Sequence, residues 1–560
     1  MKWVEEKNID SKSVKQLSSE LKINSLLSRM LVRRNIKTFD EAKSFFRPKF
    51  EDLHDPFLMN DMDVASKRIN EAITNKDTLM VFGDYDVDGT SSVAMMSLYL
   101  ESKGIKTLNY LPDRKSEGYG ISKKAIDIAF EKNIKLIIAL DCGIKAHKQI
   151  SYAKEKNIDF VICDHHNPSD KIPDAFAVLN PKRTDCSYPF KELCGCGVGF
   201  KLIQAIEQIS SDKKEIINYL DLVALAIAAD VVPLIGENRI LAYLGLQIIN
   251  SNPKLGIHSL LKTNPKKEYV LSDLMFFLAP RINAAGRIKH AKLASDLLVC
   301  LDENQSDKLA KEIEELNSQR KLIEKEMTEQ AIQQAELSEL KKSVIVSSSS
   351  WNKGVIGIVA SKLVDKFYKP SLVFCESENE VLTASARSIK GLNLYKVLED
   401  CNEYLEKFGG HKYAAGLSIK KNNFEKFKKS FDESVEKHMV NKKFDQELFI
   451  ESTIELEDIS PKFFRILKQF EPFGPGNRMP VFRSDNLKVK GKPFELGNEK
   501  EHIKLNLTQN NNSFFSAIGF WLSSKFQSIE DKSKFSVAYT IEENNWKGNS
   551  TIQLKIKDIK

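Results

Sequence analysis

Between residues 77 and 179, short apolar runs alternate with amphipathic segments, and this alternation constrains the fold more than any other feature of the chain. The apolar runs, at 78–82, 106–111, 134–140, 159–163 and 175–179, have the composition of strands buried on both faces of a sheet. Helices are predicted between them, at 91–102, 122–132 and 146–156. The pattern predicts a doubly wound parallel α/β sheet, in which ligands bind beyond the carboxyl ends of the strands.

Acidic and imidazole side chains follow three of these predicted strands. They are Asp84, Asp86 and Asp88 after the first strand, Asp141 after the third, and Asp164, His165 and His166 after the fourth. Carboxylates held close together repel one another, and a divalent cation bound through oxygen ligands relieves that repulsion. For any one Asp the alternative is a turn or a helix cap. Three strand ends that meet at one sheet edge are harder to explain by caps, so we expect a metal site there.

Asp230 follows an almost wholly apolar segment within a mainly helical region, residues 197–300. A buried carboxylate without a partner is costly, so Asp230 is expected to face a cation or strong hydrogen-bond donors. The alternative is a solvent-facing residue at the end of a helix.

Several other residues are suited to binding phosphate. Guanidinium groups bind oxyanions through two hydrogen bonds, and glycines let the backbone approach an anion closely. The candidates are Arg281 and Arg287 in the small-residue stretch 277–287, Ser385 and Arg387 within 385–388, and Gly409, Gly410 and His411. The alternatives are helix packing with solvent-facing arginines for the first pair and an ordinary glycine turn for the last group.

The remaining segments complete a division into several domains, as expected for a chain of 560 residues. Residues 1–75 are predicted to form a helical cap on the first domain, which covers 76–302, and residues 303–340 a long connecting helix with a solvated face. A second, smaller α/β domain is predicted at 341–440. Short strands separated by turn residues at 445–560 predict an OB-like β-barrel that binds nucleic acid through its aromatic and basic side chains. The alternative is that these aromatic residues form the barrel's core.

Composition places the chain among ordinary globular proteins. It is 42% hydrophobic and 29% charged, with a formal net charge of +7, which permits a polyanionic partner without requiring one. No run is long and apolar enough to span a bilayer, and the first residues lack the apolar core of a secretory signal. The eight cysteines show neither a disulfide framework nor zinc spacing. We therefore expect a cytoplasmic protein with reduced structural thiols.

Taken in order, these motifs resemble those of the DHH phosphoesterases. The matching segments are Gly83 to Gly89, Leu140 to Gly143, Asp164-His165-His166 and Ala229 to Pro233, with Gly409-Gly410-His411 matching the DHH-associated domain. The stretches 280–287, 385–388 and 472–477 narrow the resemblance to the single-strand-specific DNA exonucleases of that family, over residues 45–560. One departure is Phe82, which stands where many members carry His.

The resemblance implies a hydrolase that degrades single-stranded DNA from the 5′ end in recombination and repair, with two divalent cations, Mn²⁺ or Mg²⁺. We expect Asp86 and Asp88 to bind separate ions, Asp141 to bridge them, and His165 and Asp230 to complete the second ion's ligands. Asp84 is a further ligand or supports one, Asp164 orients a ligand, and His166 faces the scissile phosphate. Arg114, after the second strand, is expected to join the phosphate-binding residues. A helicase and a single-strand-binding protein are plausible partners of such an enzyme, itself a monomer.

Two other functions fit parts of the sequence. A DHH phosphoesterase acting on short oligonucleotides or cyclic dinucleotides would carry the same acidic motifs but would not need the barrel at 445–560. A non-catalytic single-strand-binding scaffold would need the barrel but not the intact acidic and histidine residues. The combination of both features favours the exonuclease.

Overall fold

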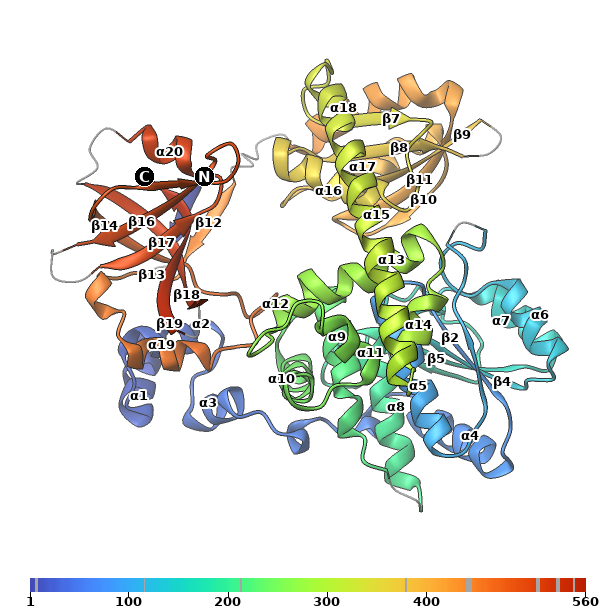
Figure 1. The fold of residues 1–560 in the computed structure, drawn as a ribbon. Coiled ribbons are helices and arrows are strands. Elements are labelled where there is room, and N and C mark those ends of the chain that lie inside the picture. Colours follow the sequence, from blue (N-terminus) through green and yellow to red (C-terminus); the bar gives the residue numbers. More distant parts are fainter. Residues whose placement is uncertain are drawn as a thin grey trace.

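The computed structural model describes residues 1–5, 9–114, 116–211, 214–377, 380–439, 446–509, 514–529, 534–546 and 549–560. The chain forms a large α/β domain, a second α/β domain joined to it by the long helix α15 (Glu303–Glu336), and a C-terminal β domain (Figure 1). The two α/β domains lie one above the other on one side, and the β domain lies on the other side (Figure 1). This agrees with the predicted fold class.

The sheet of the first domain contains five parallel strands in the order β3-β2-β4-β5-β6. The strands are β2 (Leu79–Gly83), β3 (Thr107–Tyr110), β4 (Leu136–Leu140), β5 (Asp159–Cys163) and β6 (Ala177–Leu179). The first strand along the chain, β2, pairs on one side with the second strand, β3, and on the other with the third, β4. The connections therefore leave in opposite directions from β2 and β4, which creates the crevice where doubly wound sheets bind ligands.

Helices cover both faces of this sheet, which explains why its strands are apolar throughout. One face packs against α6 (Lys123–Glu131) and α7 (His147–Glu155). The other packs against α4 (Met62–Asn75), α5 (Val87–Ser102) and α8 (Gly195–Ile209). Helix α5 begins four residues earlier than the predicted helix at 91–102, so Asp86 becomes its N-cap and Asp88 lies in its first turn.

A helical subdomain continues from α8 to the start of α15. Its helices are α9 (Leu220–Asp230), α10 (Gly236–Ser251), α11 (Leu255–Leu261), α12 (Leu271–Asp273), a π-helix at Leu274–Leu278, α13 (Ala279–Ile288) and α14 (Lys292–Leu298). Helices α9 and α13 share one hydrophobic core with α5 and α8. Within the described ranges, no helix combines the length and apolar character that a bilayer-spanning segment requires.

The second α/β domain has a mixed sheet in the order β10-β11-β9-β8-β7. Only β7 and β8 are parallel, and the other neighbours are antiparallel. One face packs against α15 and α16, and the other against α17 and α18. The elements are β7 (Val344–Ser348), α16 (Ile356–Phe367), β8 (Ser371–Glu376), β9 (Val381–Arg387), α17 (Leu394–Asp400), β10 (Leu405–Gly410), β11 (Ala414–Lys420) and α18 (Phe424–Met439).

The C-terminal domain is a strongly curved sheet in the order β13-β14-β18-β19-β17-β16-β15, in which β14 also pairs with β16. This is the OB-like arrangement that the sequence predicted. Most of its large apolar side chains face a single core, so the alternative that its aromatic residues are core residues holds for most of them. The elements are β12 (Glu447–Ile450), β13 (Ser452–Thr453), α19 (Pro461–Lys468), β14 (Phe482–Val489), β15 (Phe494–Leu496), β16 (His502–Thr508), β17 (Phe515–Gly519), α20 (Ser523–Gln527), β18 (Phe535–Trp546) and β19 (Asn549–Ile559).

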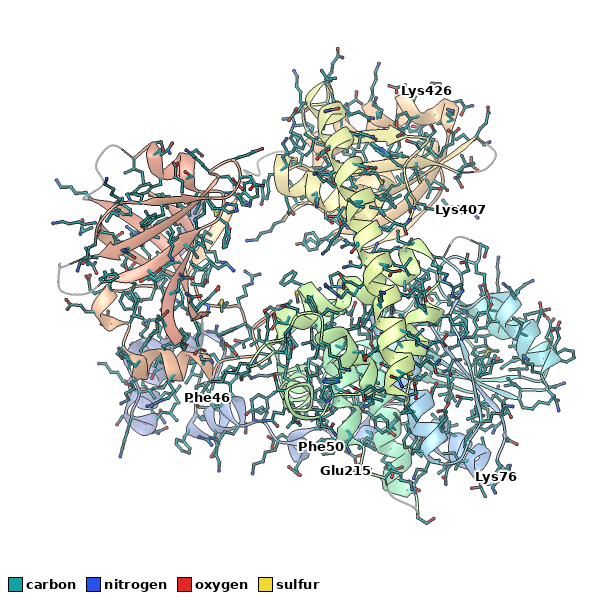
Figure 2. The ribbon with its side chains drawn as sticks, viewed as in Figure 1. Phe46, Phe50, Lys76, Glu215, Lys407 and Lys426 are labelled. Atoms are coloured by element: carbon teal, nitrogen blue, oxygen red, sulfur yellow. The ribbon has the colours of Figure 1, made fainter. Side chains whose placement is uncertain are left out.

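The prediction that residues 1–75 cap the first domain holds for α4 but not for the helices before residue 47. Strand β1 (Lys2–Glu5) pairs with β12, and helices α1 (Ser11–Leu21), α2 (Ser25–Arg33) and α3 (Phe39–Phe46) share the core of the C-terminal domain. Their polar sequence hid this placement because each helix has only a narrow apolar face. The chain then crosses to the first domain: Figure 2 shows Phe46 beside the C-terminal domain and Phe50 beneath the helices of the first.

The shared core predicts that an N-terminal substitution destabilises the C-terminal domain. Leu31 in α2 is fully buried among residues of both segments. We expect Leu31→Ala to lower the free energy of unfolding by about 2–5 kcal/mol, as for other buried Leu-to-Ala changes. Denaturant unfolding of the full chain measures this. Leu337→Ala is the control, because Leu337 is 86% exposed and should change stability little. Equal effects of the two substitutions would contradict the shared core.

Candidate metal centre and phosphate pocket

The acidic and imidazole side chains that follow β2, β4 and β5 meet at the crevice between β2 and β4, and Asp230 joins them from the end of α9. His165 lies at the centre of the group. Its Nε2 is 3.2 Å from Asp141 Oδ1, 3.7 Å from Asp230 Oδ2 and 3.9 Å from Asp88 Oδ2. Two sets of ligand atoms lie within 4.8 Å of one another: one from Asp141, His165 and His166, the other from Asp88, His165 and Asp230.

The electrostatics of this cluster favour a bound cation. Burial and the nearby carboxylates raise the pKa values of Asp84, Asp141 and Asp230 well above the usual range, and raise that of Asp88 to about 7. Burial lowers the pKa of His165 to about 3, so this ring is neutral and its nitrogen is free to bind a metal. Asp84 Oδ1 and Asp141 Oδ1 are buried and accept no hydrogen bond from the described residues. Buried oxygens without donors, beside a neutral imidazole, fit a divalent cation.

The N-terminus of α8 fixes the position of Asp88. The Gly195 N–H donates to Asp88 Oδ2 and the Cys196 N–H to Asp88 Oδ1, both at 2.7 Å. Glycine is the only residue type that fits at position 195, because a Cβ there would lie 2.5 Å from Asp141 Cβ. Sequence reasoning did not select Gly195. The available signal was the close spacing of Gly195 and Gly197 beside Cys194, which indicates a close approach of the backbone.

Asp164 has a different environment from the other acidic residues. Its Oδ1 accepts the backbone N–H groups of His165 and His166 at 2.7 and 3.0 Å and lies 2.7 Å from His166 Nδ1, while Oδ2 accepts the Ile144 N–H at 2.8 Å. Burial alone would raise its pKa, but the hydrogen bond and charge of His166 and these N–H groups lower it to about 2. With both oxygens occupied, Asp164 orients the two histidines. This placement agrees with a role in orienting a ligand.

His166 lies between the buried cluster and the second α/β domain. Its ring nitrogens lie 3.3 Å from the Tyr119 hydroxyl, and its ring centroid lies 6.4 Å from that of His411 in the second α/β domain. Burial lowers its pKa, but the hydrogen bond and charge of Asp164 outweigh this and raise it above the usual value. Tyr119 was not selected from the sequence because nothing in its surroundings distinguishes it there.

Asp86 influences the charges of the cluster, whereas Phe82 takes no part in it. Asp86 caps α5 through the Gly89 N–H at 3.1 Å, and its charge raises the pKa of Asp84 and of Asp88. Asp86 is therefore a helix cap that acts on the cluster through its charge, and its role as a metal ligand stays a prediction. Phe82 is fully buried and stacks on Tyr110 in the core on the α6 and α7 side. Its side chain is part of the packing and not of the cluster.

Four arginines from different elements surround a second site. Burial, together with the charges of Arg114, Arg320 and Arg387, lowers the pKa of Arg287 to about 9. Like charges gathered in this way favour a bound anion. Arg320 in α15 was missed because it lies in a helix expected to serve only as a connector. It is 8% exposed, its Nη1 pairs with Glu324 Oε2 at 2.5 Å, and its Nη2 donates to Asn317 Oδ1 at 3.0 Å. Only its Nε has no partner among the described residues, so Arg320 acts on the site through its charge and this nitrogen.

The second α/β domain supplies the other side of this site. The Arg387 Nη1 donates to Ser385 Oγ at 3.1 Å, and Arg287 Nη1 donates to the Gly354 carbonyl at 3.0 Å. A Cβ on Gly357, at the N-terminus of α16, would lie 3.0 Å from Ser385 Oγ and 3.1 Å from Arg387 Nη2. Helix N-termini present free N–H groups to anions, so these neighbours form a phosphate-binding arrangement, which we call the arginine pocket: Arg114, Arg287, Arg320, Ser385, Arg387 and the start of α16.

Arg281 is the exception among the predicted phosphate-binding residues. Its Nε and Nη2 donate to the Glu314 carboxylate at 2.5 and 3.2 Å, and its Nη1 donates to the Phe277 carbonyl at 2.9 Å. All three nitrogens are engaged in holding α13 to α15, so phosphate binding by Arg281 would break these contacts. The alternative of helix packing describes Arg281 better, except that its side chain is buried and does not face solvent.

Gly409 and Gly410 are the exposed end of β10, paired with Gly416 and Ala415 of β11, and His411 begins the turn between the two strands. A Cβ on Gly410, whose φ is +150°, would lie 2.4 Å from the Ala414 carbonyl oxygen, so the turn requires glycine. A Cβ on Gly409 would meet no atom within 4 Å, which leaves its backbone open to a ligand. The turn faces the first domain, since the ring of His411 approaches that of His166.

Comparison with known proteins supports one family along the whole chain. Residues 78–227 match the DHH family N-terminal domain, 341–437 the DHHA1 domain and 450–558 the RecJ OB domain. The chain is 36% identical over 562 residues to the single-stranded-DNA-specific exonuclease RecJ of Bacillus subtilis, covering all of this chain and 70% of that protein. It is 30% identical to the Haemophilus influenzae RecJ, with 95% of each chain covered.

The chain belongs to the RecJ family of single-stranded-DNA-specific exonucleases. Solved structures agree with this. A Thermus thermophilus RecJ in complex with Mn²⁺ shares the fold with a TM-score of 0.86 at 23% identity, over all of this chain and 79% of that one. An exonuclease RecJ bound to manganese has a TM-score of 0.60 at 28% identity, over 68% of this chain and 95% of that one. Membership of the RecJ family confirms the predicted resemblance and the enzyme class.

The contact between Gly195 and Asp141 predicts that a single methyl group disturbs the cluster. We expect Gly195→Ala to weaken Mn²⁺ binding about tenfold or more. The new Cβ pushes α8 away from Asp141 and so weakens the hydrogen bonds that α8 donates to Asp88. Titration calorimetry with Mn²⁺ measures this. Gly409→Ala is the control, because its Cβ meets no atom. Unchanged Mn²⁺ affinity in a folded Gly195→Ala variant would show that α8 does not support the cluster.

Proposed function

We propose that this chain removes nucleotides from the 5′ end of single-stranded DNA by hydrolysing phosphodiester bonds with two divalent cations, Mn²⁺ or Mg²⁺. The observation that carries the proposal is the convergence of carboxylate and imidazole ligand atoms within 4.8 Å at the crevice of the first sheet. Family membership supports the single-strand specificity. Work in DNA recombination and repair, and therefore in the cytoplasm, follows from the substrate.

The cluster offers two groups of ligands for the cations. Asp86 and Asp88 would hold separate ions, and Asp141, which is buried and whose Oδ1 accepts no hydrogen bond from the described residues, would be shared by both. His165 and Asp230 complete the set for the second ion, and Asp84 is a further ligand whose unpartnered Oδ1 supports this role. Mixed carboxylate and imidazole ligands suit Mn²⁺ better than Mg²⁺. Bound cations of this kind activate a water molecule and stabilise the leaving oxygen of a phosphodiester.

The protein's own residues orient the substrate beside this cluster. Asp164 holds His166 through its Nδ1, so the other ring nitrogen and the proton it carries point outward. Such a group donates to a phosphate oxygen of the bond to be cut. Tyr119 beside it and His411 across from it complete a polar surface between the two α/β domains.

The arginine pocket measures the position of the 5′ end. Arg114, Arg287 and Arg387 would bind the terminal phosphate together with Ser385 and the N-terminus of α16, and Arg320 adds charge from α15. The exposed end of β10 at Gly409 and Gly410 would approach the next phosphates. A strand end held here lies between the domains, which favours a single strand over a duplex.

The domain boundaries and partners belong to the same proposal. We keep the division at 76–302, 303–340, 341–440 and 445–560 and assign residues 1–46 to the C-terminal domain, with which they share a core. The OB-like domain would bind the strand farther from its 5′ end. A helicase that supplies single strands and a single-strand-binding protein are the expected partners of a monomeric enzyme with this substrate.

Replacing Asp141 tests both its effect on the stability of the metal-free protein and its role in hydrolysis. Its pKa is raised by burial and by neighbouring carboxylates, so above the unfolded pKa it costs the metal-free fold stability. We therefore expect Asp141→Asn to raise the melting temperature in chelator. We also expect it to lower the rate of hydrolysis more than about 100-fold, a larger loss than removing a residue that only supports a metal ligand would cause. Digestion of 5′- and 3′-labelled single-stranded DNA with Mn²⁺, Mg²⁺ or chelator measures activity and direction. Retained turnover would contradict the assignment of Asp141 to both ions.

Arg387 is the residue whose loss tests recognition of the 5′ end. A charge-assisted hydrogen bond is worth about 1.5–3 kcal/mol, so Arg387→Gln should reduce the preference for 5′-phosphate over 5′-hydroxyl ends roughly 10- to 100-fold. The ratio of kcat/KM for the two substrates measures the preference. Arg281→Gln is the matched control: it breaks the pair with Glu314 and should lower stability without changing the ratio. The pocket assignment fails if Arg387→Gln leaves the ratio intact.

A further inference from the structure

The segment that leads into the OB-like domain packs on the loop that follows Asp230. This connector, residues 471–477, ends in a tight turn in which the Gly474 and Asn477 backbones exchange hydrogen bonds of 2.9 and 3.1 Å. From this turn the Pro475 carbonyl accepts the Leu234 N–H at 2.7 Å. Leu234 is four residues after Asp230, so a single backbone hydrogen bond links the two regions close to the cluster.

Steric contacts reinforce this hydrogen bond. A Cβ on Gly474 would lie 2.6 Å from Leu234 Cδ1, and a Cβ on Gly476 would lie 3.1 Å from Ile235 Cγ2 and 3.5 Å from Pro233 Cβ. Leu234 is 1% exposed, although Val231 and Ile235 on either side of it are about half exposed. The connector thus contacts Leu234, the most deeply buried side chain of the loop at 231–235, and only glycine lets it come this close.

A buried network holds the connector in place from behind. Arg239 in α10 donates to four consecutive carbonyls at the start of the connector and just before it, those of Gln469, Phe470, Glu471 and Pro472, and also to the Phe45 carbonyl. Its guanidinium also lies 3.7 Å from the centre of the Phe45 ring. Asn477 donates to the Phe470 and Pro472 carbonyls at 2.7 and 2.8 Å and accepts from Arg34 Nε at 2.7 Å. The network joins α2 and α3, which belong to the C-terminal core, to α10 of the first domain.

Asp230 depends on this support more than the other members of the cluster do. Asp84, Asp141 and His165 extend from strands of one sheet, and Asp88 is held by α8. Asp230 is the last residue of α9, and the chain turns immediately after it, because Val231 adopts a φ of +59°. The position of its carboxylate is therefore set by how the loop at 231–235 is seated.

We propose that the connector at 471–477 positions Asp230, so that the affinity of the cluster for a divalent cation depends on how the OB-like domain is attached. Gly474 and Arg239 are positioning residues in this arrangement and touch neither substrate nor metal. The inference rests on the proposed role of Asp230 as a metal ligand. It adds that the C-terminal domain contributes to the metal site through contacts as well as to DNA binding.

Mn²⁺ binding to the full chain without DNA tests the proposal. Gly474→Ala inserts a methyl group between the connector and Leu234, and Arg239→Met removes the hydrogen bonds but keeps an apolar side chain beside Phe45. We expect both variants to bind Mn²⁺ about tenfold more weakly by titration calorimetry. In DNA digestion they should need correspondingly more Mn²⁺ for half-maximal rate while recovering their kcat at saturating Mn²⁺. Gly416→Ala is the control, because the nearest atom to its Cβ is 4.0 Å away.

Asp230→Asn distinguishes the possible failures. If Asp230→Asn weakens Mn²⁺ binding and both connector variants change only the melting temperature, the coupling is wrong and the role of Asp230 stands. If Asp230→Asn itself leaves Mn²⁺ binding unchanged, the role of Asp230 as a ligand fails, and the coupling fails with it. Weaker Mn²⁺ binding in the two connector variants but not in Gly416→Ala supports the coupling.

Discussion

Repulsion between buried carboxylates at the edge of the parallel sheet is the constraint on which the rest of this structure depends. Asp84, Asp88, Asp141 and Asp230 are all held where burial and their neighbours disfavour their charged forms. No lysine or arginine forms an ion pair with any of the four among the described residues, and the nearest imidazole is neutral at ordinary pH. A fold that keeps such groups together gains stability when cations bind, which ties the integrity of the site to the metal.

Asp164 shows that the environment, and not the residue type, decides each role. It lies on the same sheet edge, yet four hydrogen-bonding contacts hold its pKa near 2 and leave it no free oxygen. The carboxylates of the cluster have few such donors. Asp164, with four such contacts, orients its neighbours, whereas Asp84 and Asp141 each keep a buried oxygen that accepts no hydrogen bond from the described residues and is available to a metal.

The functional surfaces lie where separate parts of the chain meet. Gly286 of α13 approaches the Tyr85 carbonyl within the acidic loop, since a Cβ there would lie 3.0 Å from it. Arg287, the next residue, donates to the Gly354 carbonyl and so joins α13 to the second α/β domain. The connector joins the third domain to the loop after Asp230. Each of these contacts is short and involves backbone atoms, so small relative movements of the domains change the site directly.

The sequence alone determined the doubly wound sheet and the residues at its strand ends, because apolar strands alternating with helices allow few arrangements and parallel strands end at one edge. It also indicated Arg387, Ser385 and the glycine turn, whose residue types are suited to anions. Only the tertiary structure decided that the N-terminal helices belong to the C-terminal core, that Arg281 is committed to Glu314 while Arg320 joins the arginine pocket, and that Gly195 supports Asp88 and Asp141. The local pattern of apolar and polar residues indicates which helix or strand a segment can form by itself. Which partner a buried charge or an exposed apolar stripe finds depends on residues hundreds of positions away, and no local pattern contains that information.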